Sequence, residues 1–234
     1  MKETGQMFLK RFQIRKLAQA ALRYHFPRLA RMTEDDLKAE SAAGAAVVDL
    51  RHGVDFAEGH FPGSLNVGLA DREFVLCIGF FLSKQDRIFL VVDQAKQAHH
   101  AYLKMSRAGF AKVGGFIEAS RLTELHRLTQ LRVFDLKSTL CRGGKPEILD
   151  VRSTDEWKLT EIPGSKNIPL AQLASRVSEL SPSKPLVVAC QNGYKGAVAS
   201  SWLQASGFDS VQYLLGGMDA YVSTPLNECF AELA

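Results

Sequence analysis

One feature constrains the fold of this chain more than any other: the sequence repeats itself with a spacing of 101 residues. Val47-Val-Asp-Leu-Arg51 is matched by Ile148-Leu-Asp-Val-Arg152, and Phe61-Pro-Gly-Ser-Leu-Asn-Val67 by Ile162-Pro-Gly-Ser-Lys-Asn-Ile168. The identical pairs that keep this register include Asp49 and Asp150, Pro62 and Pro163, Gly63 and Gly164, and Asn66 and Asn167. The repeat predicts two homologous domains, 32–119 and 120–234, behind an N-terminal extension of residues 1–31.

Each repeat shows the same order of short apolar strands and helix-compatible segments. In the first repeat we expect strands at 46–50, 64–67, 88–92 and 112–117, with helices at 72–82 and 96–107. In the second we expect strands at 147–151, 166–169, 186–189 and 210–215, with helices at 171–180 and 195–205. Unbroken apolar strands that alternate with helices are typical of a parallel sheet with helices on both faces. The predicted fold class is therefore α/β, twice, plus an N-terminal helix.

Positive charge is concentrated in the N-terminal extension. The 234-residue chain has a formal net charge of +4, but residues 1–31 alone carry +7, so the remainder is net acidic. Residues 7–24 form a basic segment with helical spacing of apolar residues. A helix that packs on a domain or partner, a membrane-surface helix and an organelle transit peptide are all compatible with this segment.

The composition excludes several classes of protein. Hydrophobic residues make up 46% and charged residues 23%, which is ordinary for a globular protein. The longest apolar run near the middle, Phe74–Leu82, is far shorter than the roughly 20 residues that span a bilayer, so no transmembrane segment is expected. The four cysteines, 77, 141, 190 and 229, form no Cys-x-x-Cys pair and no zinc spacing. We expect reduced thiols, no metal site and, without a signal-peptide pattern, a cytoplasmic protein.

A reactive site is expected in the loop that follows the strand predicted at 186–189. Its sequence is Cys190-Gln-Asn-Gly-Tyr-Lys-Gly196, directly before a predicted helix. The carboxyl ends of parallel strands bind ligands, helix N-termini favour negative charge, and glycines let backbone N–H groups converge. We therefore expect a Cys190 thiol with a lowered pKa in a loop that holds anions. The residues expected to contact substrate are Gln191, Asn192, Gly193, Tyr194, Lys195 and Gly196.

The ordered motifs of the second repeat resemble the rhodanese, or sulfurtransferase, family. They are Leu149-Asp-Val-Arg152, Ile162-Pro-Gly-Ser165 with Asn167, Val187-Val-Ala-Cys190 with Gly193 and Lys195, Gly207-Phe208, and Leu215-Gly-Gly-Met218. This resemblance covers about residues 130–222, and residues 40–117 resemble a second rhodanese domain through Ala57-Glu-Gly-His-Phe-Pro-Gly63. The segment Phe74–Leu82 also resembles the rhodanese part of fusions that carry a metallo-β-lactamase domain.

The resemblance implies sulfur transfer through a persulfide on Cys190. The cysteine would take the outer sulfur of thiosulfate or of a persulfide donor and pass it to cyanide, a thiol or a protein cysteine, with ping-pong kinetics. Asp150 and Arg152 would support the site structurally, and no cofactor is implied. A carrier or docking module that passes the persulfide to a partner enzyme uses the same cysteine and stays an alternative.

The first repeat departs from the family at the cysteine. Its strand 88–92 matches the second repeat at an offset of 97, whereas Ala108-Gly-Phe110 matches at 98, which indicates a one-residue difference in the loop between them. On this alignment Asp93 stands at the cysteine position, and a carboxylate cannot carry a persulfide. We expect the first domain to be catalytically silent. The second repeat departs less, with Thr160-Glu161 where the family commonly has Gly-His, and Lys195 where many members have Arg.

Two other functions receive less support. A phosphatase or arsenate reductase on this fold resembles Cys-x5-Arg, but here Gly196 stands at the arginine position. Nucleic-acid binding is not expected, because the basic segment has few interleaved aromatic residues and the rest of the chain is net acidic.

Overall fold

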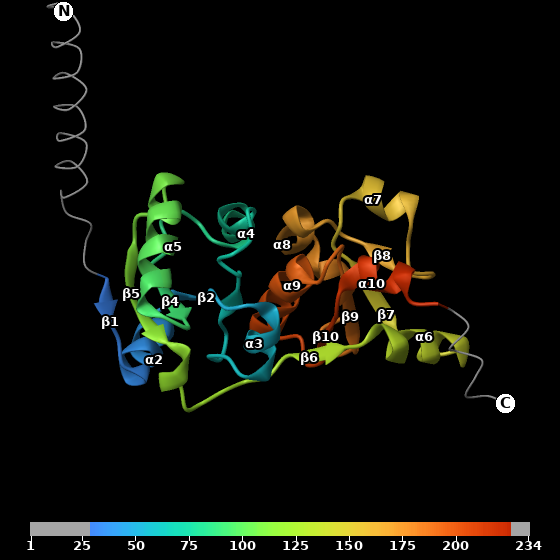
Figure 1. The fold of residues 1–234 in the computed structure, drawn as a ribbon, viewed down its shortest axis with the longest axis horizontal. Coiled ribbons are helices and arrows are strands. Elements are labelled where there is room, and N and C mark those ends of the chain that lie inside the picture. Colours follow the sequence, from blue (N-terminus) through green and yellow to red (C-terminus); the bar gives the residue numbers. More distant parts are fainter. Residues whose placement is uncertain (1–28, 226–234) are drawn as a thin grey trace, which may run out of the picture. The chain divides into compact units, whose positions relative to one another are not determined.

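The computed structural model describes residues 29–225, so the helix predicted at 7–24 and Cys229 lie outside the described residues. The chain divides into two units, Met1–Ala30 and Arg31–Ala234, and the contacts below are internal to the second unit. Figure 1 shows two strand-and-helix modules in this unit. We call the part around the first sheet the first domain and the part around the second sheet the second domain.

Each domain contains a parallel sheet, as the sequence predicted, but the sheet has five strands where four were expected. The first sheet has the order β1-β5-β4-β2-β3 and the second has the order β6-β10-β9-β7-β8. The strands of the first sheet are β1 (Ala30–Arg31), β2 (Ala46–Asp49), β3 (Leu65–Asn66), β4 (Ile88–Val92) and β5 (Val113–Glu118). The strands of the second sheet are β6 (Thr129–Leu131), β7 (Glu147–Asp150), β8 (Lys166–Asn167), β9 (Leu186–Ala189) and β10 (Val211–Leu214).

Helices connect these strands. In the first domain they are α2 (Glu34–Ala42), α3 (Gly53–Glu58), α4 (Phe74–Phe81), α5 (Ala95–Arg107) and the 3-10 turn η1 (Ala119–Arg121). In the second domain they are α6 (Val133–Cys141), α7 (Thr154–Leu159), η2 (Leu170–Gln172), α8 (Leu173–Arg176), η3 (Val177–Glu179), α9 (Tyr194–Ala205) and α10 (Gly217–Ser223). The helix predicted at 171–180 is thus broken into three short turns. The α/β class is confirmed. The helices α2, α3, α6, α7 and α10 were not predicted, and two of them, α3 and α7, directly follow the Asp-x-Arg motifs.

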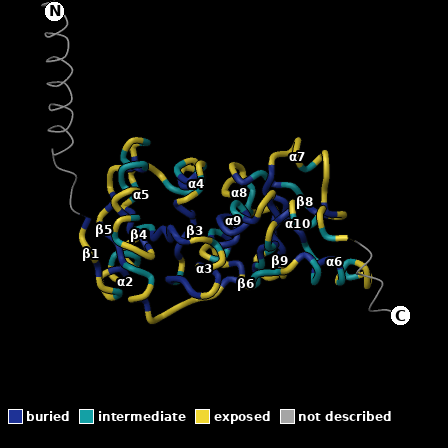
Figure 2. Tube along the Cα trace, viewed as in Figure 1, coloured by how far each residue is buried: buried dark blue, intermediate teal, exposed yellow. Residues whose placement is uncertain are grey.

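The central strands lie in the cores of the two domains. All five residues of β4 and all four of β9 are buried, and these strands are dark blue in Figure 2. The first core packs α2 against the sheet through Leu37, Val91 and Ile117, and the second packs α6 through Leu136, Ile148 and Val187. Among residues 29–225, no helix combines the length and apolar character needed to cross a membrane.

Helix α9 of the second domain also packs against the first domain. The backbone N–H of Asn66 in β3 donates to Ser201 Oγ at 2.9 Å, and the Phe81 and Trp202 rings stack at 5.1 Å between centroids. A Cβ on Gly53 would lie 2.7 Å from the Ala197 side chain, so the two backbones approach closely there. Seven residues of α9 are buried, namely Gly196, Ala197, Val198, Ala199, Ser200, Ser201 and Leu203. Because most of these buried side chains are small, α9 can pack closely against both domains.

Candidate active site

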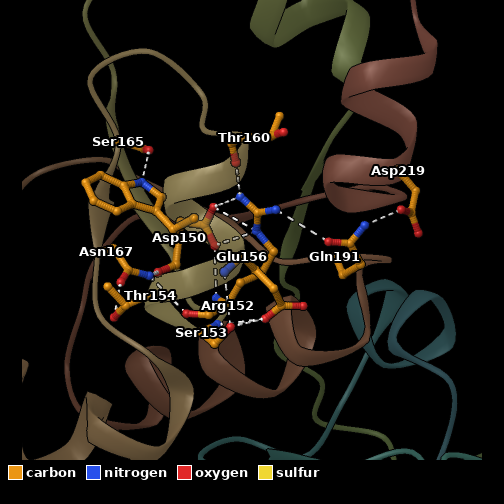
Figure 3. Close-up of polar contacts among 11 residues, drawn as sticks. Asp150, Arg152, Ser153, Thr154, Glu156, Thr160, Ser165, Asn167, Gln191 and Asp219 are labelled. Atoms are coloured by element: carbon orange, nitrogen blue, oxygen red, sulfur yellow. Dashed lines mark hydrogen bonds and ion pairs between the residues drawn. The ribbon is translucent and has the colours of Figure 1, made fainter.

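An ion pair at the end of β7 joins the last residue of this strand to the segment that follows it. Arg152 Nε lies 3.1 and 3.0 Å from the two oxygens of Asp150, and Nη2 donates to Asp150 Oδ2 at 2.7 Å. A second bond runs from Arg152 Nη2 to the Thr160 carbonyl at 2.6 Å (Figure 3). Asp150 is fully buried and Arg152 is 5% exposed, so each charge depends on the other for stabilisation.

The same arrangement recurs in the first domain. Arg51 binds Asp49 through Nη2 at 2.6 Å and donates to the Gly59 carbonyl at 2.8 Å. Asn66 Nδ2 donates to the carbonyls of Asp49 and Arg51, which fastens β3 to β2. Burial raises the pKa of Asp49, with Arg51 acting against it. The repeated Asp-x-Arg motif is therefore part of the architecture of both domains.

Thr160, which stands where the family commonly has glycine, does not disturb this contact of the arginine. Thr160 and Gly59 accept the arginine bond through backbone carbonyls, so the side chain at that position does not decide the contact. In the second domain Asn167 Nδ2 donates to the carbonyls of Asp150 and Arg152, both at 3.0 Å. The sequence repeat identified Asn167 without assigning it this bracing role.

Cys190 lies at the carboxyl end of β9, where the sequence places it. The backbone N–H groups of Gly193 and Gly196 both donate to Cys190 Sγ at 3.1 Å. Gly193 has φ +94°, a left-handed conformation that glycine adopts without strain, and it precedes the first turn of α9. The loop thus directs two amide dipoles at one sulfur atom, an arrangement that stabilises negative charge there.

The predicted lowering of the Cys190 pKa is wrong for the structure as it stands. Cys190 is 1% exposed, and burial raises the pKa of its thiol. The amides of Gly196, Gly193 and Asn192 lower the pKa but do not offset the burial. The error has a physical cause, because the sequence showed the donors around the sulfur but not its removal from water.

A second glycine segment holds the loop from the other side. The backbone N–H of Met218 donates to the Cys190 carbonyl at 2.8 Å, and that of Asp219 donates to the Gln191 carbonyl at 2.9 Å. Gly217 has φ +58°, and a Cβ there would collide with the Cys190 carbonyl and lie 2.7 Å from the Gln191 carbonyl. The Leu215–Met218 motif, which carried part of the family resemblance, therefore anchors the loop.

The side chains predicted to contact substrate point in several directions. Gln191 bridges the loop to its surroundings, since Arg152 Nη1 donates to its Oε1 at 3.4 Å and its Nε2 donates to Asp219 (Figure 3). Asn192 is exposed, and its Oδ1 accepts from the Tyr194 N–H at 3.1 Å.

Two loop side chains reach the first domain instead of the sulfur. Lys195 Nζ lies 2.7 Å from Glu73 Oε2, and Tyr194 Oη donates to the Gly68 carbonyl at 3.2 Å. The Glu73 carboxylate raises the pKa of Lys195, although burial acts in the opposite direction. The lysine therefore stays charged, with that charge directed at Glu73.

Strand register corrects the alignment of the two loops. Asp49 in β2 pairs with Val91 in β4, whereas the equivalent Asp150 pairs with Ala189 in β9. The residue after Ala189 is Cys190, so its counterpart is Val92, and Asp93 corresponds to Gln191. The offset is 98 throughout, and the predicted one-residue difference in loop length disappears. The apolar sequence of the strand fits an offset of 97 as well as one of 98, whereas the pairing of the strands in the sheet fits only 98.

The remaining described cysteines differ from Cys190. Cys77 is fully buried in α4, and burial raises the pKa of its thiol to about 12. Cys141 is exposed at the end of α6. In the described part of the chain, no group of three or more His, Cys, Asp or Glu side chains is placed to hold a metal ion.

Comparison with known families gives the same assignment as the motifs. The family described as Rhodanese-like domain matches the chain twice, over residues 33–117 and 135–224. The chain belongs to the rhodanese-like family. Its rhodanese-like domains have the parallel sheets and the Asp-x-Arg pairs at the same strand ends, and the second of them carries the loop cysteine.

Several relatives of known name share part of this rhodanese-like sequence. A 105-residue stretch is 35% identical to Rhodanese-like/PpiC domain-containing protein 12, chloroplastic, of Arabidopsis thaliana and covers 43% of this chain and 32% of that protein. Thiosulfate sulfurtransferase GlpE of Pseudoalteromonas translucida is 30% identical over 74 residues, covering 32% of this chain and 70% of that protein. The chain spans only 32% and 23% of the length of two Arabidopsis relatives.

Among solved structures, the thiosulfate sulfurtransferase of Pseudomonas aeruginosa is 22% identical, with a TM-score of 0.37. The similarity covers 83% of this chain and 42% of that one.

Proposed function

We propose that this rhodanese-like chain is a sulfurtransferase that carries sulfur as a persulfide on Cys190. The position of Cys190 Sγ carries the proposal, because it lies at the carboxyl end of β9 and accepts two backbone N–H groups at 3.1 Å. Such a loop suits a sulfur atom that must hold negative charge twice, first as thiolate and then as persulfide.

The proposed reaction has two half-reactions. The Cys190 thiolate attacks the outer sulfur of thiosulfate, a new S–S bond forms, the S–S bond of thiosulfate breaks, and sulfite leaves with the electron pair. An acceptor such as cyanide or a thiolate then attacks the outer sulfur of the persulfide, and the Cys190 thiolate leaves. A persulfide donor would lose a thiolate in place of sulfite. No cofactor takes part in either step.

Access to the sulfur is part of this mechanism. Because Cys190 is 1% exposed, the donor must enter where the loop faces solvent, at the exposed Gln191. Lys195 can bind the anionic donor only by releasing Glu73, which lies 2.7 Å from its ammonium group. Replacing Glu73 with glutamine should lower the KM for thiosulfate by up to about fivefold, and an unchanged KM would remove Lys195 from the donor site.

The first domain, proposed at residues 32–119, has a non-catalytic role. Val92 stands at the cysteine position and offers no nucleophile. We propose residues 120–234 as the catalytic domain. The three described cysteines are free, which fits the cytoplasmic setting proposed from the sequence.

Intact-mass spectrometry after brief exposure to thiosulfate, or to a persulfide donor, tests the proposal. The wild type and a Cys77→Ser control should gain one sulfur atom that cyanide removes, whereas Cys190→Ser should gain none. If both variants load equally, or if neither donor loads the wild type, sulfur transfer through Cys190 is refuted.

A carrier that serves a partner protein is the second candidate. The chain is 27% identical over 129 residues to the putative sulfur carrier protein YrkF of Bacillus subtilis, which covers 53% of this chain and 68% of that one. Fast turnover with cyanide supports the enzyme. Negligible turnover, combined with rapid transfer to a protein cysteine, supports the carrier.

A further inference from the structure

A cavity of about 760 Å³ lies at the carboxyl end of the first domain's sheet. Its walls come from the segments after β2, β3 and β4, from α5, and from the facing loop and β10 of the second domain. This volume is in the range of pockets that enclose a small organic molecule, roughly 300–1,000 Å³. Cys190 does not line the cavity, so its chemistry must be argued separately from sulfur transfer.

Carboxylates outnumber free cations in this cavity. Asp55, Asp71 and Asp93 line it, and among residues 29–225 no cationic side chain lies within ion-pairing distance of Asp55 or Asp93. Arg51 also lines it; its guanidinium is bound to the buried carboxylate of Asp49 and interacts at longer range with those of Asp93 and Asp55, which leaves the carboxylates in excess. Lys104 supplies one positive charge, with its ammonium group 3.3 Å from the Leu69 carbonyl. Two exposed histidines, His52 and His100, also line the cavity.

One buried polar group faces the cavity without a partner. Tyr213 lines the cavity, is 2% exposed, and its Oη has no hydrogen-bond partner; Ser200 Oγ is the other such atom in the described part of the chain. The hydroxyl lies 3.6 Å from the position of a Cβ on Gly53, which also lines the cavity. Burial, with Asp55 and Cys190 contributing, raises the pKa of Tyr213 to about 12, so the phenol is neutral at physiological pH. A buried hydroxyl without a partner costs free energy, and a ligand that hydrogen-bonds to it would remove that cost.

Apolar groups complete the lining. Leu50, Val54, Leu69, Ala197 and Leu215 surround the polar groups. An amidinium or guanidinium group donates hydrogen bonds to carboxylates and a phenol oxygen at once, and a flat or apolar body fits the remaining walls. A carboxylate or thiosulfate would instead face the charges of Asp55 and Asp93.

We propose that this cavity of the first domain binds a small organic cation, with its charged group between Asp55 and Asp93 and a hydrogen bond to Tyr213 Oη. The first domain, which lacks the family's cysteine nucleophile, thus binds a cation, whereas the loop of the second domain is proposed to bind an anion. The loop residues Asn192 and Gly193 line the same cavity, so the ligand would contact both domains.

Three probes of nearly identical shape separate charge from shape. Benzamidinium, neutral benzamide and anionic benzoate can be titrated into the full chain and followed by saturation-transfer NMR and calorimetry. We expect saturable binding of benzamidinium, binding about tenfold weaker for benzamide, and none for benzoate. No binding of benzamidinium, or equal binding of all three, would overturn the proposal.

Matched variants locate the binding. The Asp55→Asn/Asp93→Asn pair should weaken benzamidinium about tenfold, whereas Asp155→Asn/Asp209→Asn, which removes two exposed surface charges, should leave binding unchanged. Tyr213→Phe should weaken benzamidinium a few-fold without lowering the Tm, because the hydroxyl has no partner in the free protein. Equal effects of the two Asp→Asn pairs, or unaltered binding in Tyr213→Phe, would refute the assignment. These readouts are independent of sulfur transfer.

Discussion

Replacing Gly217 with alanine tests whether the segment after β10 sets the shape of the cysteine loop. Gly217 has φ +58°, and an added Cβ would collide with the Cys190 carbonyl. That collision would break the bonds from Met218 N–H and Asp219 N–H, which are 2.8 and 2.9 Å long. A left-handed φ costs alanine about 1–2 kcal/mol, and each lost hydrogen bond costs about 1 kcal/mol. The free energy of unfolding should therefore fall by roughly 3–4 kcal/mol.

Gly164→Ala is the matched control. Gly164 has φ +81° and a Cβ there would meet no atom within 4 Å, so only the backbone strain of about 1–2 kcal/mol applies. Urea denaturation measures both losses, and the rate at which iodoacetamide alkylates Cys190 reports the state of the loop. Gly217→Ala should speed this alkylation and Gly164→Ala should not. Equal losses of stability with unchanged Cys190 reactivity would show that Gly217 does not hold the loop.

Three further predictions concern buried ionisable groups. Burial lowers the pKa of His60 from 6.5 to about 4. The folded protein therefore favours the neutral imidazole, and the resulting contribution to the free energy of unfolding, roughly 3 kcal/mol, is complete above pH 6.5 and is lost as the pH falls towards 4. Urea titrations over this range should show that loss in the wild type, and an equal slope in His60→Gln would contradict it. Arg152→Met leaves the Asp150 carboxylate unpaired and should cost about 3–5 kcal/mol in thermal unfolding, and adding Asp150→Asn should recover part of it; a cost below about 1 kcal/mol would mean that the pair is not needed. Because burial raises the pKa of Cys190, its alkylation should be slower than that of exposed Cys141 at pH 8 and should still increase above about pH 8.5; a plateau below pH 8 would refute this.

Much of the fold could be predicted because its strands are short, apolar and repeated. The strand predicted at 88–92 matches β4, and the strand predicted at 186–189 matches β9, since buried parallel strands form unbroken apolar runs. The helix α7 was missed although Ser153 and Glu156 form a capping box at its start. That pattern was a usable local signal, but the helix is only six residues long and has no apolar periodicity.

The candidate site divides into parts that the sequence can and cannot show. A glycine loop after a strand predicts that amides converge on Cys190, and the structure brings those of Gly193 and Gly196 to its sulfur. The pKa of the thiol depends on how far the sulfur is buried, and that depends on segments distant in sequence. The partner of Lys195 is likewise distant, since Glu73 belongs to the other domain. Pairwise contacts of this kind leave no periodicity for a single sequence to reveal.

The shared helix α9 also limits how the two domains can diverge. The helix that begins at the cysteine loop is buried on several sides, and Asn66 and Gly53 of the first domain touch it directly. A larger side chain at Ala197 would therefore disturb both domains at once. Substitutions in α9 are therefore constrained by the packing of both domains, although Val92 gives the first domain no nucleophile at the position of Cys190.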